Sequence, residues 1–213
     1  MTQLSTKYTL SPPTHTHTNH TTYKAIDKIN GIQVAYHEVT PTNQYTYQRF
    51  RTQLRKLTNC DHESVVVYYD YDVDYEKQVM VYTTEVFEEG GCERYGYLGM
   101  VMVRMLRGGY VSKGAIRKWC YQIIDGLVYM HRARVGHERV MLDKLWVGVD
   151  GVKIAGDVGS VVDCDMDACE CEDTFGVAIC VIQLITGDKE TYDLLFNHSI
   201  SYLLINVCFA FLF

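Results

Sequence analysis

SKGAIRKWCYQIIDGLVYMHRARVGHERVMLDKLWVGVDGVKIAGDVG, residues 112–159, is the stretch that decides the fold. Its first half repeats apolar residues at the spacing of a helix with one buried face, at Ile116, Trp119, Cys120, Ile123, Ile124, Leu127, Val128 and Met130. Ser112 is a favoured residue type for the N-cap of this helix. Two β-rich runs follow, 144–149 and 151–154, joined by the hairpin dipeptide Asp150-Gly151. The stretch therefore predicts a long helix, an irregular loop and a hairpin.

This order of elements resembles the centre of the C-lobe in eukaryotic protein kinases. Residues 137–144 stand where a kinase has its HRD-x-x-x-x-N catalytic loop, and Asp157-Val158-Gly159 stands where it has DFG. Lys118-Trp119-Cys120, Gly126-Leu127 and Met130-His131 are most similar to the with-no-lysine (WNK) kinases and to the nuclear-receptor-binding-protein pseudokinases. The resemblance implies an α+β, protein kinase-like two-lobe fold. Its N-lobe has an antiparallel sheet and the αC helix, and its C-lobe is incomplete and mainly helical.

The composition favours one folded domain with tails. Hydrophobic residues make up 47% of the chain and aromatic residues 12%, which is enough for a sizeable core. The net charge of −6 gives no reason to expect nucleic-acid binding, which needs a basic surface. Residues 1–20 lack the apolar segment of a secretory signal, so a cytoplasmic location is expected. Three cysteines fall inside expected helices and are interpreted as free buried thiols: Cys60, Cys120 and Cys180.

The resemblance divides the chain into four expected regions. They are a polar Thr/His-rich tail (1–21), a kinase-like N-lobe without a Gly-rich loop (22–87), a partial C-lobe (88–187) and a divergent apolar tail (188–213). The last apolar run, 200–213, contains Asn206 and is shorter than the about 20 residues of a membrane-spanning helix. Membrane anchoring is therefore not expected, and the run is interpreted as packing on the preceding helix or marking a truncated reading frame.

Residues 22–39 are expected to form a hairpin, with strands 23–26 and 32–36 joined by a type I′ turn at Asn30-Gly31. By resemblance this is the β2–β3 hairpin of the N-lobe, where a kinase carries the lysine that neutralises the phosphates of the nucleotide. His37 occupies that lysine position.

WNK kinases take a substitute lysine from the Gly-rich loop just upstream. The matching stretch here, 15–23, has His20 at the substitute position and contains no glycine. Because only glycine lets the backbone approach phosphates closely, the sequence predicts that the phosphate lid is absent. His15, His17 and His20 could instead bind a metal, although a flexible Thr/His tract is more often a disordered tail.

A helix is expected over 45–57, from the spacing of Tyr47, Phe50, Leu54 and Leu57. It resembles αC, with Gln53 in place of the αC glutamate. Strands are expected at 64–69 and 78–86, with an acidic turn between them at 70–76, and a short helix is expected over 95–106.

The stretch Thr84-Glu85-Val86-Phe87 resembles the kinase hinge, with Thr84 at the gatekeeper position. The nucleotide-binding positions that the resemblance implies are Ala35, Thr84, Glu85, Phe87, Leu145 and Asp157. Asp157 is also the magnesium position, but a lone carboxylate is a poor Mg²⁺ site and could equally be a solvated turn residue.

The catalytic loop lacks the residues of its chemistry. A kinase needs a carboxylate at the third HRD position to orient the substrate hydroxyl and accept its proton, and this chain has Arg139, a permanent cation. Met141 replaces the loop lysine, and Lys144 replaces the asparagine that holds magnesium. His137 is expected to bond and pack beneath the activation segment, as its family counterpart does.

The activation segment is shortened to 161–173 and has no Ala-Pro-Glu motif, because 174–182 already resembles αF. A solvated acidic turn is the simplest interpretation of 161–173. Calcium and zinc are the alternatives, and each has an incomplete ligand set: Asp163, Asp165 and Asp167 for calcium, and Cys164, Cys169 and Cys171 for zinc.

The sequence therefore predicts a catalytically inactive, WNK-like pseudokinase that binds protein partners as a scaffold or allosteric module and needs no cofactor. Two alternatives stay open. One is a residual serine/threonine protein kinase that binds ATP and Mg²⁺, and the other is a truncated product without a function.

Overall fold

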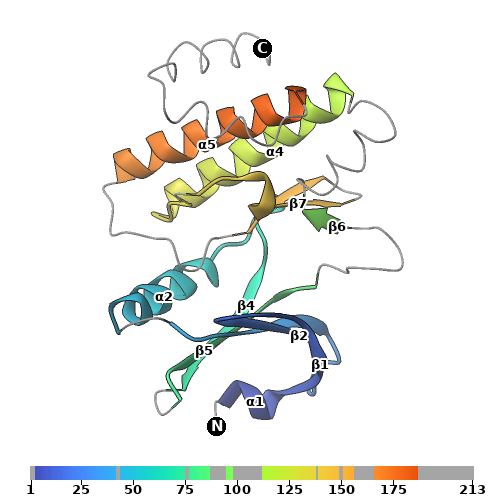
Figure 1. Ribbon diagram of the computed structural model, residues 1–213, viewed down its shortest axis with the longest axis vertical. Helices are drawn as coiled ribbons and strands as arrows, with labels where there is room; N and C mark the ends of the chain where they lie inside the picture. Colours follow the sequence, from blue (N-terminus) through green and yellow to red (C-terminus); the bar gives the residue numbers. More distant parts are fainter. Residues whose placement is uncertain are drawn as a thin grey trace. The chain divides into compact units, whose positions relative to one another are not determined.

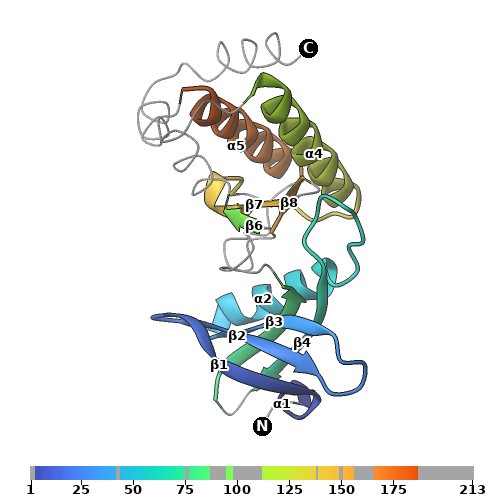
Figure 2. The same cartoon turned by 90° about the vertical axis from the view of Figure 1, so that its right-hand side faces the viewer.

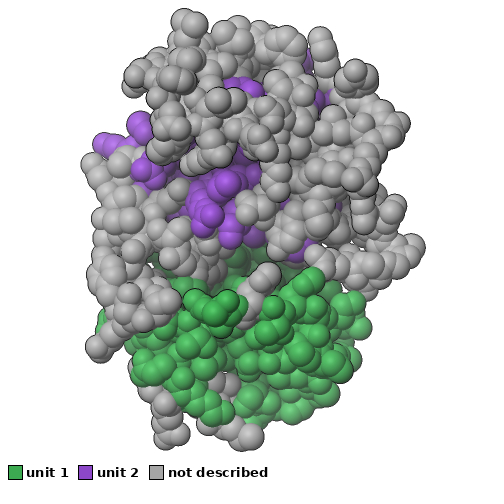
Figure 3. Space-filling model, in the orientation of Figure 1, with its two compact units in different colours: residues 1–62, 66–87 green, residues 63–65, 88–213 purple. Residues whose placement is uncertain are grey.

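The computed structural model describes residues 3–41, 44–74, 77–86, 95–97, 112–137, 139–148, 151–155 and 166–186. The chain divides into two compact units, residues 1–62 with 66–87 and residues 63–65 with 88–213 (Figure 3). The first unit is built on an antiparallel sheet and the second is mainly helical. The α+β two-lobe fold predicted from the sequence is confirmed at this level.

The first unit contains a five-stranded antiparallel sheet with the strand order β1-β2-β3-β5-β4 (Figure 1). Its strands are β1 (Tyr8–His17), β2 (His20–Asp27), β3 (Gln33–Val39), β4 (Tyr68–Asp74) and β5 (Val79–Glu85). Its helices are α1 (Gln3–Lys7) and α2 (Gln44–Leu57). The apolar spacing that predicts α2 is confirmed, since Tyr47, Phe50, Leu54 and Leu57 are all buried.

Residues 1–21 do not form the expected tail. Residues 3–7 are helical and β1 pairs with β2 along its length, from Tyr8 opposite Asp27 to His17 opposite His20. The turn between the two strands is Thr18-Asn19, so the hairpin that would carry a phosphate lid is present although it has no glycine. An edge strand pairs on one side only, which is why a polar run containing Pro12 and Pro13 can join the sheet.

The β2–β3 hairpin is confirmed, but its turn is not type I′. A type I′ turn needs positive φ at both central residues, and of the two only Gly31 has one, at +73°. The loop is longer and is closed by the Asp27 N–H, which donates to the Ile32 carbonyl at 2.9 Å. The expected acidic turn at 70–76 is also wrong, because the residues as far as Asp74 belong to β4.

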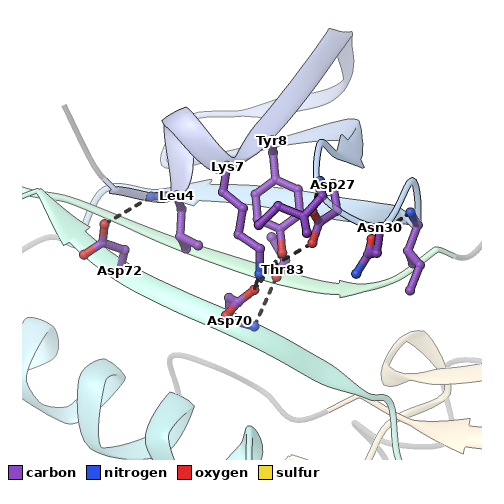
Figure 4. A network of polar contacts seen from close by, with 10 residues as sticks. Leu4, Lys7, Tyr8, Asp27, Asn30, Asp70, Asp72 and Thr83 are labelled. Atoms are coloured by element: carbon purple, nitrogen blue, oxygen red, sulfur yellow. Dashed lines mark hydrogen bonds and ion pairs between the residues drawn. The ribbon is translucent and has the colours of Figure 1, made fainter.

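One face of the sheet is closed by α1 and the start of β1. Its core consists of Leu4, Tyr8, Ala25, Val34, Tyr36 and Val81. Beside this core, Lys7 Nζ and Tyr8 Oη both donate to Asp70 Oδ2 at 2.7 Å, and Lys7 Nζ lies 3.5 Å from Asp27 Oδ2 (Figure 4). The N-terminal segment is therefore held by both apolar packing and charge.

The second unit pairs the helices α4 (Lys113–Arg132) and α5 (Met166–Thr186), which lie side by side in both views (Figures 1 and 2). A small sheet contains β6 (Tyr95–Tyr97), β7 (Leu145–Gly148) and β8 (Val152–Ile154), preceded by the single turn η1 (Leu142–Lys144). Residues 63–65 join this unit, and Ser64 O accepts a 2.8 Å hydrogen bond from the Ile154 N–H.

The predicted long helix, loop and hairpin are confirmed, and Ser112 Oγ caps α4 by accepting from the Ala115 N–H at 3.1 Å. The helix expected over 95–106 is wrong at its start, because 95–97 form β6 opposite β7. Tyr95 and Tyr97 favour a strand, and the glycine between them disfavours a helix. Residues 98–106 and the tail 188–213 lie outside the described residues.

Helix α5 begins at Met166, so the end of the expected acidic turn is helical. Cys169 is buried and disulfide-bonded, whereas Cys171 is exposed and free. The three cysteines expected to be free and buried are confirmed as such: Cys60, Cys120 and Cys180. None of the helices in the described part of the chain is both long and apolar enough to cross a membrane.

Candidate functional site

His37 lies in a polar cluster on the sheet face opposite to Tyr36. The ladders place Thr22, His37 and Tyr82 directly opposite one another on β2, β3 and β5. His37 Nδ1 lies 3.1 Å from His20 Nε2 and 3.2 Å from Thr22 Oγ1, and the His37 ring stacks on Tyr82 with centroids 4.6 Å apart. The two positions expected to carry or replace the phosphate-binding lysine are thus in direct contact.

The direction of the hydrogen bonds through His37 follows from Thr84. The Thr84 hydroxyl donates to the Glu85 carbonyl at 3.1 Å, so it accepts from His37 Nε2–H, also at 3.1 Å. His37 Nδ1 is then the acceptor that faces His20 and Thr22. Burial, with a smaller contribution from the charge of His20, lowers the pKa of His37 from 6.5 to about 3. His37 is therefore neutral near pH 7.

The hinge positions are partly described. Thr84 is buried and pairs with the half-buried Ala35 across the β3–β5 ladder. The Glu85 N–H donates to the Val67 carbonyl at 3.0 Å, and Glu85 Oε1 accepts from the Val67 N–H at 2.9 Å. The Glu85 carbonyl accepts from the Thr84 hydroxyl. Phe87 lies outside the described residues.

Gln53 is buried on α2, with 6% of its surface exposed. Its Nε2 is a buried side-chain donor without a hydrogen-bond partner among the described residues. A neutral amide therefore stands at the position where the resemblance implies a glutamate, and it makes no ion pair that could hold a cation on β3.

In the second unit, a buried carboxylate fixes the loop after α4. Asp173 on α5 is fully buried, and its Oδ2 accepts from His131 Nε2 at 2.7 Å and from the His137 N–H at 2.9 Å. His137 is also fully buried, and its Nε2 donates to the Ala155 carbonyl at 2.8 Å. His137 is thus bonded and packed as expected, but residues 156–165, which include the start of the segment it was expected to lie beneath, are outside the described residues.

The loop lies directly against α5. A Cβ added at Gly176 would lie 2.7 Å from the Val140 carbonyl oxygen, and Cys180 Sγ donates to the same oxygen at 3.8 Å. Only glycine at 176 allows this approach, because the atom in the way is main chain. The loop is therefore fixed along α5 by packing as well as by Asp173.

Known proteins with similar sequences include WNK kinases. No protein-family model matches the chain. Over 147 residues, 65% of this chain, it is 31% identical to a probable serine/threonine-protein kinase WNK4 of Arabidopsis thaliana and spans 24% of its length. Over the same number of residues it is 27% identical to a probable WNK6 kinase of Oryza sativa subsp. japonica and spans 31% of it.

The fold comparison agrees. The kinase domain of Mycobacterium tuberculosis PknI superposes with a TM-score of 0.71 at 13% identity, over 85% of this chain and 73% of that domain. The chain is a protein kinase-like domain, similar in sequence to WNK kinases.

The residues at the catalytic positions of the kinase-like loop differ in how exposed they are. Arg139, at the position of the catalytic aspartate, is exposed, and its N–H donates to His137 Nδ1 at 3.3 Å. Met141 and Lys144 are half-buried, and the Lys144 N–H donates to the Met141 carbonyl at 2.9 Å. Leu145 is fully buried in β7. Asp157 lies outside the described residues.

These residues do not fit ATP and Mg²⁺ as a kinase-like domain would hold them. A neutral imidazole stands where a cation would meet the phosphates, and Lys144 stands where a neutral oxygen ligand would hold magnesium. Within the described residues, no group of three or more His, Cys, Asp or Glu side chains is arranged to hold a metal. The zinc interpretation loses Cys169 to its disulfide.

The sequence analysis missed Thr22, His131 and Asp173. One signal for Asp173 was available, because Cys169, Asp173, Gly176 and Cys180 recur at helical spacing, so the aspartate falls within the stripe of α5 that faces the loop. An aspartate in such a stripe needs buried donors. Nothing in the sequence shows that those donors are His131 and His137.

Proposed function

We propose that this kinase-like domain is a catalytically inactive, WNK-like pseudokinase that acts as a protein-binding scaffold or allosteric module. The observation that carries the proposal is Arg139 in a loop whose frame is otherwise intact, since His137 and Asp173 hold that frame. A positioned general base contributes roughly 10²–10⁴-fold to rate. Arginine cannot supply it, because its guanidinium stays protonated.

The sheet of the first unit supports the same proposal. Most kinases bind phosphate with a lysine on β3, and WNK kinases with a substitute lysine just upstream. Here the two positions carry His37 and His20, and the neutral His37 offers no charge to a phosphate. Its Nε2–H is already donated to Thr84. The proposal therefore includes no required cofactor, with ATP and Mg²⁺ as the alternative because Thr84 and the Glu85 main chain keep a hinge-like arrangement.

A folded domain without its chemistry can still present a surface to other proteins, because the fold is independent of the site. Protein partners are accordingly proposed, and nucleic acid and membrane are not. The cytoplasm is the proposed location because Cys60, Cys120 and Cys180 are free thiols, as in a reducing compartment; the disulfide of Cys169 is the observation against it.

Phosphotransfer from γ-labelled ATP tests the proposal directly. Purified chain, incubated with Mg²⁺ and a general protein substrate, is expected to transfer no more label than its Asp157→Ala variant. A matched WNK kinase domain, prepared in the same way, shows that the assay works. Transfer by the wild-type chain that disappears in the Asp157→Ala variant would establish the alternative, a residual serine/threonine kinase.

A nucleotide titration separates loss of binding from loss of catalysis. A ligand that binds only the folded state at 100 times its Kd stabilises that state by about 2.7 kcal/mol. Millimolar ATP with Mg²⁺ is expected to leave the melting temperature unchanged. A rise in melting temperature without phosphotransfer would keep the pseudokinase and assign it a nucleotide.

A further inference from the structure

Imidazole groups concentrate on three neighbouring strands at one end of the sheet in the first unit. In the β1–β2 ladder His15 lies opposite Thr22 and His17 lies opposite His20, and in the β2–β3 ladder Thr22 lies opposite His37. Four of the eight histidines of the chain thus occupy neighbouring positions of one sheet. In the proposed function, His37 matters only because it stands where a kinase has a lysine. The proposed function does not explain why histidines gather here.

Three atoms that are able to bind a metal ion lie close together in the cluster. His20 Nε2, His37 Nδ1 and Thr22 Oγ1 form a triangle with sides of 3.1, 3.2 and 3.4 Å. A tetrahedral zinc ion with bonds of about 2.0–2.1 Å holds its ligand atoms about 3.3 Å apart. The triangle therefore already has the size of one face of a zinc tetrahedron.

The surroundings of His37 are those of an oriented ligand. Metal-binding imidazoles donate their second N–H to a fixed acceptor, which sets both the tautomer and the plane of the ring. His37 Nε2–H donates to Thr84 Oγ1, which itself donates to the Glu85 carbonyl. Tyr82 stacks on the ring at an interplanar angle of 14°. His37 Nδ1 is thus aimed at His20 and Thr22 before any ion binds.

We propose that His20, His37 and Thr22 form a binding site for a divalent transition metal, with zinc as the best fit. Imidazole suits zinc, copper and nickel, whereas magnesium and calcium take oxygen ligands. With the two imidazoles and the hydroxyl as protein ligands, water completes the coordination. When the ion binds, the proton on His20 Nε2 moves to Nδ1 of the same ring, so that both imidazoles bind the ion as neutral ligands. This site does not depend on whether the chain transfers phosphate.

Titration of the full chain with Co²⁺, a coloured substitute for zinc, tests the site. After treatment with a chelator, the reduced wild-type chain is expected to bind one Co²⁺, with the visible absorption of a four-coordinate ion that Zn²⁺ removes. His20→Ala is expected to weaken binding by at least about tenfold, and Thr84→Val, which removes the acceptor behind His37, by about tenfold. His62→Ala removes a histidine outside the cluster and is expected to bind as the wild type does.

Circular dichroism of each variant shows that loss of binding is not loss of fold, and His20→Ala carries the conclusion if His37→Ala does not fold. Cysteine ligands would reveal themselves by thiolate-to-cobalt charge transfer and by binding that survives in His20→Ala. Either that result or the absence of saturable binding by the wild-type chain would overturn the proposal. Neither result would alter the phosphotransfer assay, so the two proposals fail separately.

Discussion

The polar face of the first unit and the loop of the second unit hold the residues at their kinase positions in different surroundings. On the sheet, the residue at the lysine position, His37, is half-buried and contacts both neighbouring strands: Thr22 on β2, and Tyr82 and Thr84 on β5. In the loop, the replacing residue Arg139 is exposed, and the frame beneath it is held by Asp173. In the first region the side chain is part of a polar network inside the sheet, and in the second it faces solvent above a buried network.

The difference has a physical reason. A side chain inside a sheet must satisfy its polar atoms within the protein, because an unpaired buried donor or acceptor costs about 1–3 kcal/mol. A side chain that faces solvent has water as its partner. Arg139 therefore needs no partner inside the protein, whereas His37 needs hydroxyl and imidazole neighbours, and those same neighbours form the proposed metal site.

The largest expected effect comes from removing Asp173, the buried carboxylate that fixes the loop after α4. Asp173→Ala leaves His131 Nε2 and the His137 N–H without their acceptor in a fully buried place. At about 1–3 kcal/mol for each donor left unpaired, the free energy of unfolding is expected to fall by about 2–5 kcal/mol. Urea denaturation measures this loss, and hydrogen exchange at α4 and α5 locates it in the second unit.

Asp167→Ala is the matched control, because Asp167 is exposed on the first turn of the same helix. Its effect is expected to stay within about 0.5 kcal/mol. If the two variants were equally stable, the loop frame would not depend on the buried carboxylate, and the contrast between the two regions would lose its basis.

The sequence predicts the elements whose periodicity is strong. The stripe from Ile116 to Met130 and the pattern of Tyr47, Phe50, Leu54 and Leu57 are long enough to predict α4 and α2. Sequence patterns fail for β1, a run of threonine, histidine and proline in which Tyr8, the first residue, is buried and residues 9–16 are exposed. A polar edge strand has no hydrophobic pattern to detect.

The sequence alone could not predict the candidate site, because it did not give the register of the β2–β3 hairpin. A two-residue turn at Asn30-Gly31 would pair Ile29 with Ile32 and therefore Lys24 with His37. The observed loop shifts the register by two residues and brings Thr22 opposite His37. That shift joins His20, Thr22 and His37. Likewise, the partners of Asp173 lie 36 and 42 residues earlier in the chain, a separation that no local pattern reports.

An intermediate effect is expected from pH, acting on the sheet and not on the loop. The folded pKa of His37, about 3, is below its unfolded value of 6.5, so only the unfolded chain gains a proton as the pH falls between these values. Stability is therefore full above the unfolded pKa and is lost as the pH falls toward the folded one. From about pH 7.5 to about pH 5 this loss amounts to about 2 kcal/mol.

His37→Gln removes the titrating group and keeps a polar side chain of similar reach. The fall in the free energy of unfolding between the two pH values is expected to be about 2 kcal/mol smaller in His37→Gln than in the wild type. Urea denaturation at both pH values checks this, with His62→Gln as the control that keeps the wild-type slope. Equal slopes for wild type and His37→Gln would show that the imidazole is not kept neutral by its surroundings.

The smallest expected effect lies on the opposite face of the same sheet, where charge replaces the neutral network. The hydrogen bond with Asp70 raises the pKa of Lys7, so its contribution is present below the unfolded value of 10.5 and is lost only as the pH rises through the folded one. Lys7→Met is expected to cost about 0.5–1 kcal/mol, equally at about pH 5 and about pH 7.5, because Lys7 is partly exposed and Tyr8 still donates to Asp70. Urea denaturation in low and high salt measures this cost, which falls as salt screens the ion pair.

Lys24→Met is the control, because Lys24 is an exposed lysine on β2, and it should show no comparable loss of stability. If Lys7→Met lowered the free energy of unfolding more at low pH than at neutral pH, the two faces of the sheet would be coupled. The contrast between charged and neutral polar networks would then hold between the two units but not within the sheet.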